Sequence, residues 1–221
     1  MAVKIHKGDI NNIPEGAVII SKHKALDMQW NLMNNWTPTK EVLFFKFGPG
    51  ILAATSIISS TLIMKHYRNK LKLLSIGRAL LFIPGVVFPS LMIPPFYVKA
   101  VTQPILLQDH CPICIQMRSV TIQSMVSISY PILVSSVGTL LMANTYGTYR
   151  IPEFSFFSIK KISDMLSFWR KISKRLFSNL PMHFLLQFIV AIFITEMTAK
   201  EVFKVQAEVE FRNPSSSLYN K

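Results

Sequence analysis

The sequence has few acidic residues and few cysteines. It contains 11 Asp and Glu against 24 Lys and Arg, and only 2 Cys among 221 residues. Two cysteines cannot form the set of disulfides that holds a small secreted domain together. No apolar run of signal-peptide length follows the first charged residues. The N-terminal region has no arginine and contains acidic residues, which is untypical of a mitochondrial transit peptide. We therefore expect any organellar targeting signal to lie inside the chain.

The sequence also lacks the motifs of catalysis and metal binding. It shows no nucleophile–base pair, no phosphate-binding loop and no four-ligand zinc set. We therefore expect a non-enzymatic protein without a metal or other cofactor. The excess of positive charge does not indicate nucleic-acid binding, because no soluble domain that would present a basic surface fits between the apolar segments.

Apolar residues dominate the chain. Half of the residues are hydrophobic, and the mean hydropathy is +0.36, which soluble domains of this length rarely reach. Four stretches are long and apolar enough to cross a membrane as helices, near residues 42–64, 73–98, 119–143 and 180–199. The sequence thus predicts an all-α integral membrane protein. Its expected parts are an N-terminal extension (1–41), a four-helix transmembrane domain (42–205) and a tail (206–221).

Small residues recur along the third predicted span. Their spacing of three or four positions places them in one narrow stripe on a helix, where they let a neighbouring backbone approach closely. We therefore expect this span to pack in the middle of the bundle, although an ordinary serine-rich span is the alternative. In the first span, Gly50 and Ala54 form a small-xxx-small pair of the same kind. The stripe consists of Ser124, Ser127, Pro131, Ser135 and Gly138.

The second predicted span is rich in proline, with Pro84, Pro89, Pro94 and Pro95. Proline removes a backbone donor and clashes with the preceding turn, so this span is expected to be kinked or to end near Ile93. Broken helices mark substrate sites in some transporters. That alternative needs a matching interruption elsewhere, and only the proline of the third span resembles one.

The loops differ in charge. The loop after the first span holds five Lys and Arg and no acidic residue, and the loop 144–179 is also basic, whereas the loop 99–118 has only two basic residues. The positive-inside rule therefore places the first and third loops in the cytoplasm, or in the matrix of a mitochondrion. The second loop and both termini would face the more oxidising side. There Cys111 and Cys114 are expected to form a local disulfide, with two free thiols as the alternative.

The third loop contains a basic amphipathic segment. Its apolar residues recur at helical spacing, which suits a helix lying on an anionic membrane surface, such as one containing cardiolipin. A tryptophan on the apolar side would anchor it at the interface. The alternative is a connector helix packed on the bundle. The predicted lipid- and partner-binding residues are Lys160, Lys161, Trp169, Arg170, Lys171, Lys174 and Arg175. Further on, Glu196 near the end of the fourth span is expected to pair with Lys46.

Several short motifs in a fixed order resemble the transmembrane protein 126 family. The resemblance covers roughly residues 40–205, with four spans and similar loop lengths; the first forty residues and the serine-rich tail match poorly. The first motifs are Cys111-x-x-Cys114, Arg118-Ser119 and Tyr130-Pro131. The later ones are Leu166-Ser167-Phe168-Trp169-Arg170, Leu185-Leu186-Gln187 and Glu196.

The resemblance implies a protein of the mitochondrial inner membrane that acts in the assembly of respiratory complex I. The implied partners are other complex I assembly factors and membrane-arm intermediates, in a hetero-oligomer, and the family brings no catalytic residues. Three alternatives stay open: an accessory subunit retained in the mature complex, a transporter or channel subunit, and a thiol redox protein that uses the two cysteines.

Overall fold

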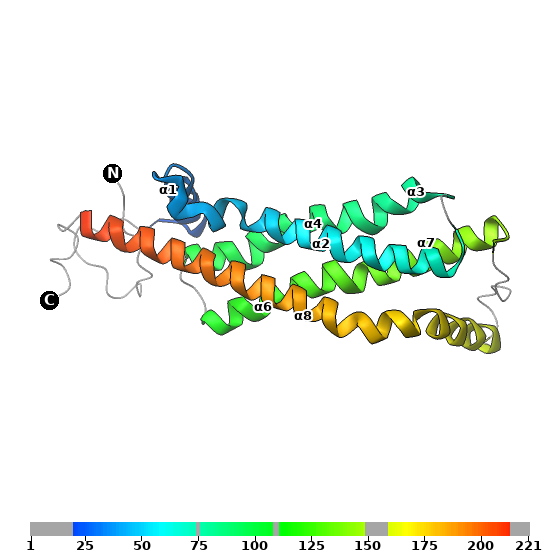
Figure 1. Ribbon diagram of the computed structural model, residues 1–221. Coiled ribbons are helices and arrows are strands. Elements are labelled where there is room, and N and C mark those ends of the chain that lie inside the picture. Colours follow the sequence, from blue (N-terminus) through cyan, green and yellow to red (C-terminus); the bar gives the residue numbers. More distant parts are fainter. Residues whose placement is uncertain (1–19, 74–75, 108–110, 149–158, 213–221) are drawn as a thin grey trace.

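Four long helical spans lie side by side in the computed structural model (Figure 1). The structure describes residues 20–73, 76–107, 111–148 and 159–212; in the last segment, side chains are described from 166 onward, except at 210 and 212. Within these ranges the chain contains helices and no strand. The prediction of an all-α protein with four membrane-spanning helices is therefore confirmed. The helices long and apolar enough to span a membrane are Thr39–Lys70, Arg78–Leu106, Pro112–Thr145 and Leu166–Val209.

The first span is preceded by a short helix that packs on the end of the bundle. Helix α1 (Lys22–Asn34) begins where Ser21 accepts a hydrogen bond from the Lys24 backbone N–H. A 3₁₀ turn, η1 (Thr39–Val42), then leads into α2 (Leu43–Lys70). The ring of Trp30 on α1 lies 5.1 Å from that of Phe45 on α2. The tryptophan thus covers the end of the core within the chain.

The second span is continuous, so of the two expected outcomes, a kink or an end near Ile93, the end near Ile93 is wrong. It consists of α3 (Arg78–Phe82), a π-helical turn η2 (Ile83–Val87), α4 (Phe88–Tyr97), a second π-helical turn η3 (Val98–Thr102) and α5 (Gln103–Leu106). The third span has the same construction, with α6 (Pro112–Ser124), the π-helical turn η4 (Met125–Ser129) and α7 (Tyr130–Thr145). Both spans therefore reach into the segment that was expected to be a loop.

The π-helical turns explain why proline does not break these helices. Each turn ends two residues before a proline, namely Pro89, Pro104 and Pro131. The residue directly before each proline donates its N–H to the carbonyl five positions back instead of four. A wider turn gives the proline ring room beside the preceding carbonyls, which is where it would clash in a regular α-helix.

The last helix, α8 (Ile159–Arg212), joins the amphipathic segment and the fourth span into one element of 54 residues. The side chains of 159–165 lie outside the described residues, and Leu166 is exposed, but the apolar side chains from Trp169 to Leu176 pack within the chain. Trp169 and Ile172 pack with Leu71 of the first span and with Leu140 of α7. From Trp169 onward the segment is therefore packed as in the connector alternative, because the bundle covers that part of the apolar face.

The first and third spans occupy the middle of the bundle. Each packs against all three other spans, whereas the second and fourth contact each other mainly near α5. The central position expected for the third span is thus observed, and α2 shares it. Figure 1 shows the C-terminal end of α2 and the first turns of α8 at the same end of the bundle.

Candidate functional site

The small-residue stripe of the third span faces the second span. The Ser135 Oγ lies 3.3 Å from the position that a Cβ on Gly85 would occupy. A Cβ on Gly138 would lie only 2.5 Å from the Leu81 Cδ2. Along the stripe, Ser127, Pro131 and Ser135 are buried, while Ser124 and Gly138 are half-buried. The stripe therefore forms a close helix contact within the chain.

The small-xxx-small pair predicted on the first span does not form a helix contact like that of the stripe. Gly50 and Ala54 are exposed, and no atom lies within 4 Å of a Cβ built on Gly50. This pair therefore does not pack within the chain. The close approach on α2 is instead at Gly48, where a Cβ would meet the Ile194 Cγ2 of α8 at 2.9 Å. Gly48 shares its face with the buried Ser56, at helical spacing, and this second run of small residues is the signal that would have found it.

Two buried glutamines join three spans at the centre of the bundle. The Gln123 Nε2 of α6 donates to the Gln187 Oε1 of α8 at 2.6 Å and to the Leu52 carbonyl oxygen of α2 at 3.1 Å. The Gln187 Nε2 in turn donates to the Ser59 Oγ at 2.7 Å and to the Thr55 carbonyl oxygen at 3.1 Å. Amides in an apolar layer are costly unless they are hydrogen-bonded, so these bonds fix how the three helices face one another. The sequence analysis missed Gln123.

A second set of hydrogen bonds lies nearer the ends of α4 and α6. The Tyr97 hydroxyl donates to the Thr195 Oγ1 at 3.3 Å, and the Thr195 Oγ1 lies 2.8 Å from the Ser119 Oγ. These residues come from the second, fourth and third spans, respectively. The second and fourth spans, which otherwise touch little, are therefore linked directly by the Tyr97–Thr195 hydrogen bond, and Ser119 joins the third span to the same threonine.

At the opposite end of α2 from its basic loop, a carboxylate from α8 caps the helix. Glu201 accepts the backbone N–H groups of Phe44 and Phe45 at 2.9 and 2.7 Å. These N–H groups have no partner within a helix that begins at Leu43, so a carboxylate there satisfies them and interacts favourably with the helix dipole. The sequence analysis did not identify this contact, which joins residues far apart in the chain.

The ion pair expected between Lys46 and Glu196 is not formed. Glu196 pairs with Lys200, one turn further along the same exposed face of α8, at 2.7 Å. The Lys46 Nζ donates instead to the carbonyl oxygen of Asn34 at 2.8 Å. Each group thus has a nearer partner, the first on its own helix and the second at the end of α1.

The described basic residues in the first part of α8 are exposed. Arg170, Lys171, Lys174 and Arg175 are exposed, whereas the side chains of Lys160 and Lys161 lie outside the described residues. Trp169 is half-buried among side chains of the bundle, with its ring 5.5 Å from that of Phe177. Its observed role is packing within the chain. The charges, in contrast, are available to a partner or a membrane surface.

The contacts that hold this segment in place come from α2. The Tyr67 hydroxyl lies 2.9 Å from the Ser173 Oγ, and the His66 Nε2 lies 3.3 Å from the carbonyl oxygen of Ile172. A carbonyl oxygen only accepts, so the proton of this imidazole contact is on Nε2. These bonds bring the basic end of α2 beside the basic part of α8.

Cys111 and Cys114 are exposed free thiols, so the expected local disulfide is not formed in this structure. Cys111 stands directly before Pro112, the first residue of α6. The backbone N–H of Cys114, and after it that of Ile113, lowers the pKa of Cys111 below its ordinary value, because these groups stabilise the thiolate. Within the described residues, no group of three or more His, Cys, Asp and Glu could hold a metal ion.

The lowered pKa predicts a reactive thiol at Cys111. In a Cys114→Ser variant, the rate of iodoacetamide labelling should rise with pH along a curve whose midpoint lies below that of free cysteine. The physical reason is that the thiolate is the nucleophile, and the start of α6 stabilises it. Labelling of the purified full-length protein across a pH series, read by mass spectrometry, measures the midpoint. A midpoint equal to that of free cysteine would contradict this prediction.

The fold and its contacts define a four-span, all-α, multi-pass membrane protein with a basic end. The chain belongs to the transmembrane protein 126 family, whose family model matches residues 27–211. A Drosophila melanogaster protein named transmembrane protein 126 is 32% identical over 207 residues, which cover 93% of this chain and 90% of that relative. No solved structure matches the chain. The resemblance noted in the sequence is thereby confirmed.

Proposed function

We propose that this protein is a non-enzymatic scaffold of the mitochondrial inner membrane that assists the assembly of respiratory complex I. Membership in the transmembrane protein 126 family carries the proposal, since the role implied by that resemblance is complex I assembly. Its partners would be other assembly factors and membrane-arm intermediates. The glutamines at the bundle centre favour this reading over a transporter, because both amide nitrogens and the Gln187 Oε1 bond to neighbouring helices. Only the Gln123 Oε1 has no hydrogen-bond partner within the described residues, which leaves little polar capacity for a substrate.

The exposed charges of α8 supply the surface that such a scaffold would present. Because the bundle already covers the apolar face of this segment from Trp169 onward, its cations need no role in folding. They would attract acidic partner surfaces or an anionic leaflet that contains cardiolipin. The positive-inside rule supports a matrix location for this end. Both termini would then face the intermembrane space.

The test of this proposal removes four exposed charges of α8, those of Arg170, Lys171, Lys174 and Arg175. In cells that lack the native protein, a quadruple Gln variant should fail to restore complex I and should leave incomplete intermediates. Each lost charge removes on the order of 1 kcal/mol of attraction to an anionic surface. Native gels with mass spectrometry of the bands measure this outcome. The same gels show whether the wild-type protein migrates with intermediates only or also with finished complex I, as a retained subunit would.

A matched control removes four exposed cations from other parts of the molecule. The residues are Lys24, Lys40, Lys99 and Arg118, all changed to Gln. This control should restore complex I and keep its orientation, because the basic end of the bundle is unchanged. Protease digestion of a C-terminal tag in mitoplasts checks the orientation of every variant. Full rescue by a correctly oriented, normally expressed quadruple variant would refute the role of this surface.

A further inference from the structure

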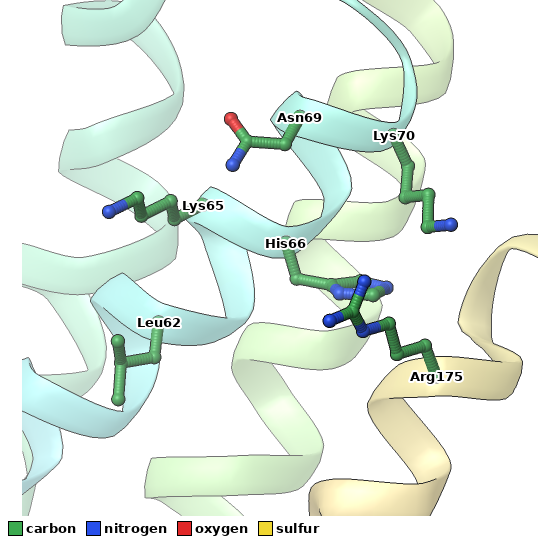
Figure 2. Close-up of a pocket in the computed structure, with 6 residues that line it drawn as sticks. All are labelled: Leu62, Lys65, His66, Asn69, Lys70 and Arg175. Atoms are coloured by element: carbon green, nitrogen blue, oxygen red, sulfur yellow. The ribbon is translucent and has the colours of Figure 1, made fainter.

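A cleft of about 500 Å³ lies between the C-terminal end of α2 and the basic part of α8. Figure 2 shows Arg175 reaching from α8 toward His66 on α2, with Lys70 on the next turn. The cleft is open to the surroundings; five of its six lining residues belong to α2, and Arg175 belongs to α8. Its lining residues are Leu62, Lys65, His66, Asn69, Lys70 and Arg175.

The charge of the cleft is unbalanced. Lys65, Lys70 and Arg175 are cations, and within the described part of the chain no carboxylate lies at salt-bridge distance from any of them. Asn69 adds an amide that can donate hydrogen bonds to the same space. Three cations around one hollow repel each other, and an anion with several acceptor oxygens relieves that repulsion. The chemistry therefore fits a phosphate group.

One residue that lines the cleft, Leu62, is apolar, and the exposed face of α2 continues from it to Ile58. Leu62 is 48% exposed, and Ile58, one turn earlier on the same face of α2, is 56% exposed. This face therefore changes from apolar to basic within two turns, where the span ends. A free phosphate ion would gain nothing from the apolar part. A phospholipid matches both parts, because its acyl chain would lie along Ile58 and Leu62 while its phosphate reaches the cations.

We propose that this cleft binds one anionic phospholipid through its phosphate, between the first and fourth spans. The site shares Arg175 with the exposed cations of α8, but it differs from that surface because it holds a single molecule in a defined place. His66 is already held by the Ile172 carbonyl, so one wall of the cleft is fixed before the lipid enters. The inference stands whether or not the protein acts in complex I assembly.

Native mass spectrometry of the full-length protein in a neutral detergent tests the site. The probes are phosphatidylglycerol, phosphatidylcholine as the lipid without net charge, and inorganic phosphate. Phosphatidylglycerol should give one retained adduct and phosphatidylcholine should give much less. Changing Lys65, Lys70 and Arg175 together to Gln should weaken phosphatidylglycerol binding on the order of a hundredfold. Equal retention of the two lipids by the wild-type protein would overturn the proposal.

The matched control changes Lys24, Lys40 and Lys99 to Gln, which removes the same charge from exposed positions outside the cleft and outside the basic part of α8. Its binding should stay within about a factor of three of the wild type, because exposed charges away from the site are screened. An equal loss in both triple variants would mean diffuse attraction and would overturn the discrete site. Thermal melting of each variant verifies the fold.

Two single substitutions complete the test: one checks that the cleft binds an anion, and the other distinguishes a lipid from a free ion. Asn69→Glu places a carboxylate in the cleft and keeps every cation, so it should abolish binding of phosphatidylglycerol even if the triple variant proves unstable. Leu62→Ser should weaken phosphatidylglycerol several-fold while leaving inorganic phosphate unaffected, because only the lipid has an apolar part. If inorganic phosphate displaces the lipid and Leu62→Ser has no effect on lipid retention, the occupant is free phosphate and the lipid assignment is wrong.

Discussion

Replacing Gly138 with leucine should separate the second and third spans, whereas the same change at Gly50 should leave the bundle intact. A Cβ on Gly138 would lie 2.5 Å from the Leu81 Cδ2, and a leucine adds three more carbon atoms to that space. Overpacking of this kind costs about 1–3 kcal/mol. The measurement is thermal unfolding of the purified variants in detergent, where Gly138→Leu should melt well below the wild type.

Gly50→Leu is the matched control, because nothing lies within 4 Å of its Cβ position. Both leucine variants should insert normally, since each makes its span more apolar. Gly138→Ala should have a smaller effect, because the crowded atom belongs to the end of a leucine side chain that can rotate. Equal melting temperatures for the two leucine variants would show that the stripe is not a helix contact. A folded Gly50→Leu variant that loses partners would assign Gly50 and Ala54 to a contact with another protein.

The contrast between these two glycines shows what the sequence could and could not predict. Spacing identifies residues that share one face of a helix, and this was enough to predict the stripe through Ser135 and Gly138. Spacing does not say which face is turned inward. In α2 the exposed face carries Ile51 and Ile58, which are as apolar as the buried side chains. A face that contacts lipid has no need of polar residues, so the exposed and buried faces have similar compositions. Hydrophobic periodicity therefore could not separate Gly48 from Gly50.

The continuity of the second span could not be predicted for a different reason. A proline clashes with a regular α-helical turn, so Pro89 and its neighbours favoured a break. The π-helical turn before Pro89 removes that clash through one shifted hydrogen bond, from Phe88 to Ile83. Residue types alone do not specify this shift. It is stabilised by packing on α2 and α7, which depends on the whole bundle.

The amphipathic part of α8 raised an ambiguity that the sequence could not resolve. An apolar stripe beside basic residues fits a helix on a membrane and equally a helix packed on protein. The deciding contacts come from Leu71 and Leu140, in two other spans. The basic charges on its outer face were predicted correctly as exposed at Arg170 and Lys174, because charged side chains do not enter a packed contact without partners.

Changing Gln187 to leucine should destabilise the bundle by about 2 kcal/mol. Single interhelical hydrogen bonds in membranes average about 0.6 kcal/mol. Gln187, however, takes part in contacts of 2.6, 2.7 and 3.1 Å with two other spans, and its loss leaves buried polar groups with fewer partners. Gln123→Leu should cost a similar amount. Unfolding of the purified variants in detergent, followed by circular dichroism, measures both changes.

The double variant distinguishes a shared network from two separate contacts. Each single variant loses the bond between the two amides, so the sum of the two single costs counts this bond twice. The double variant loses it only once. Two apolar side chains then occupy the space without leaving an amide unpaired. The double variant should therefore cost less than the sum of the single variants by about 1 kcal/mol or more. Gln116→Leu is the control, since Gln116 is half-buried on the same helix and makes no side-chain hydrogen bond within the described residues. Strict additivity would mean that the two amides act independently, and the packing of α2, α6 and α8 would then depend on their apolar contacts alone.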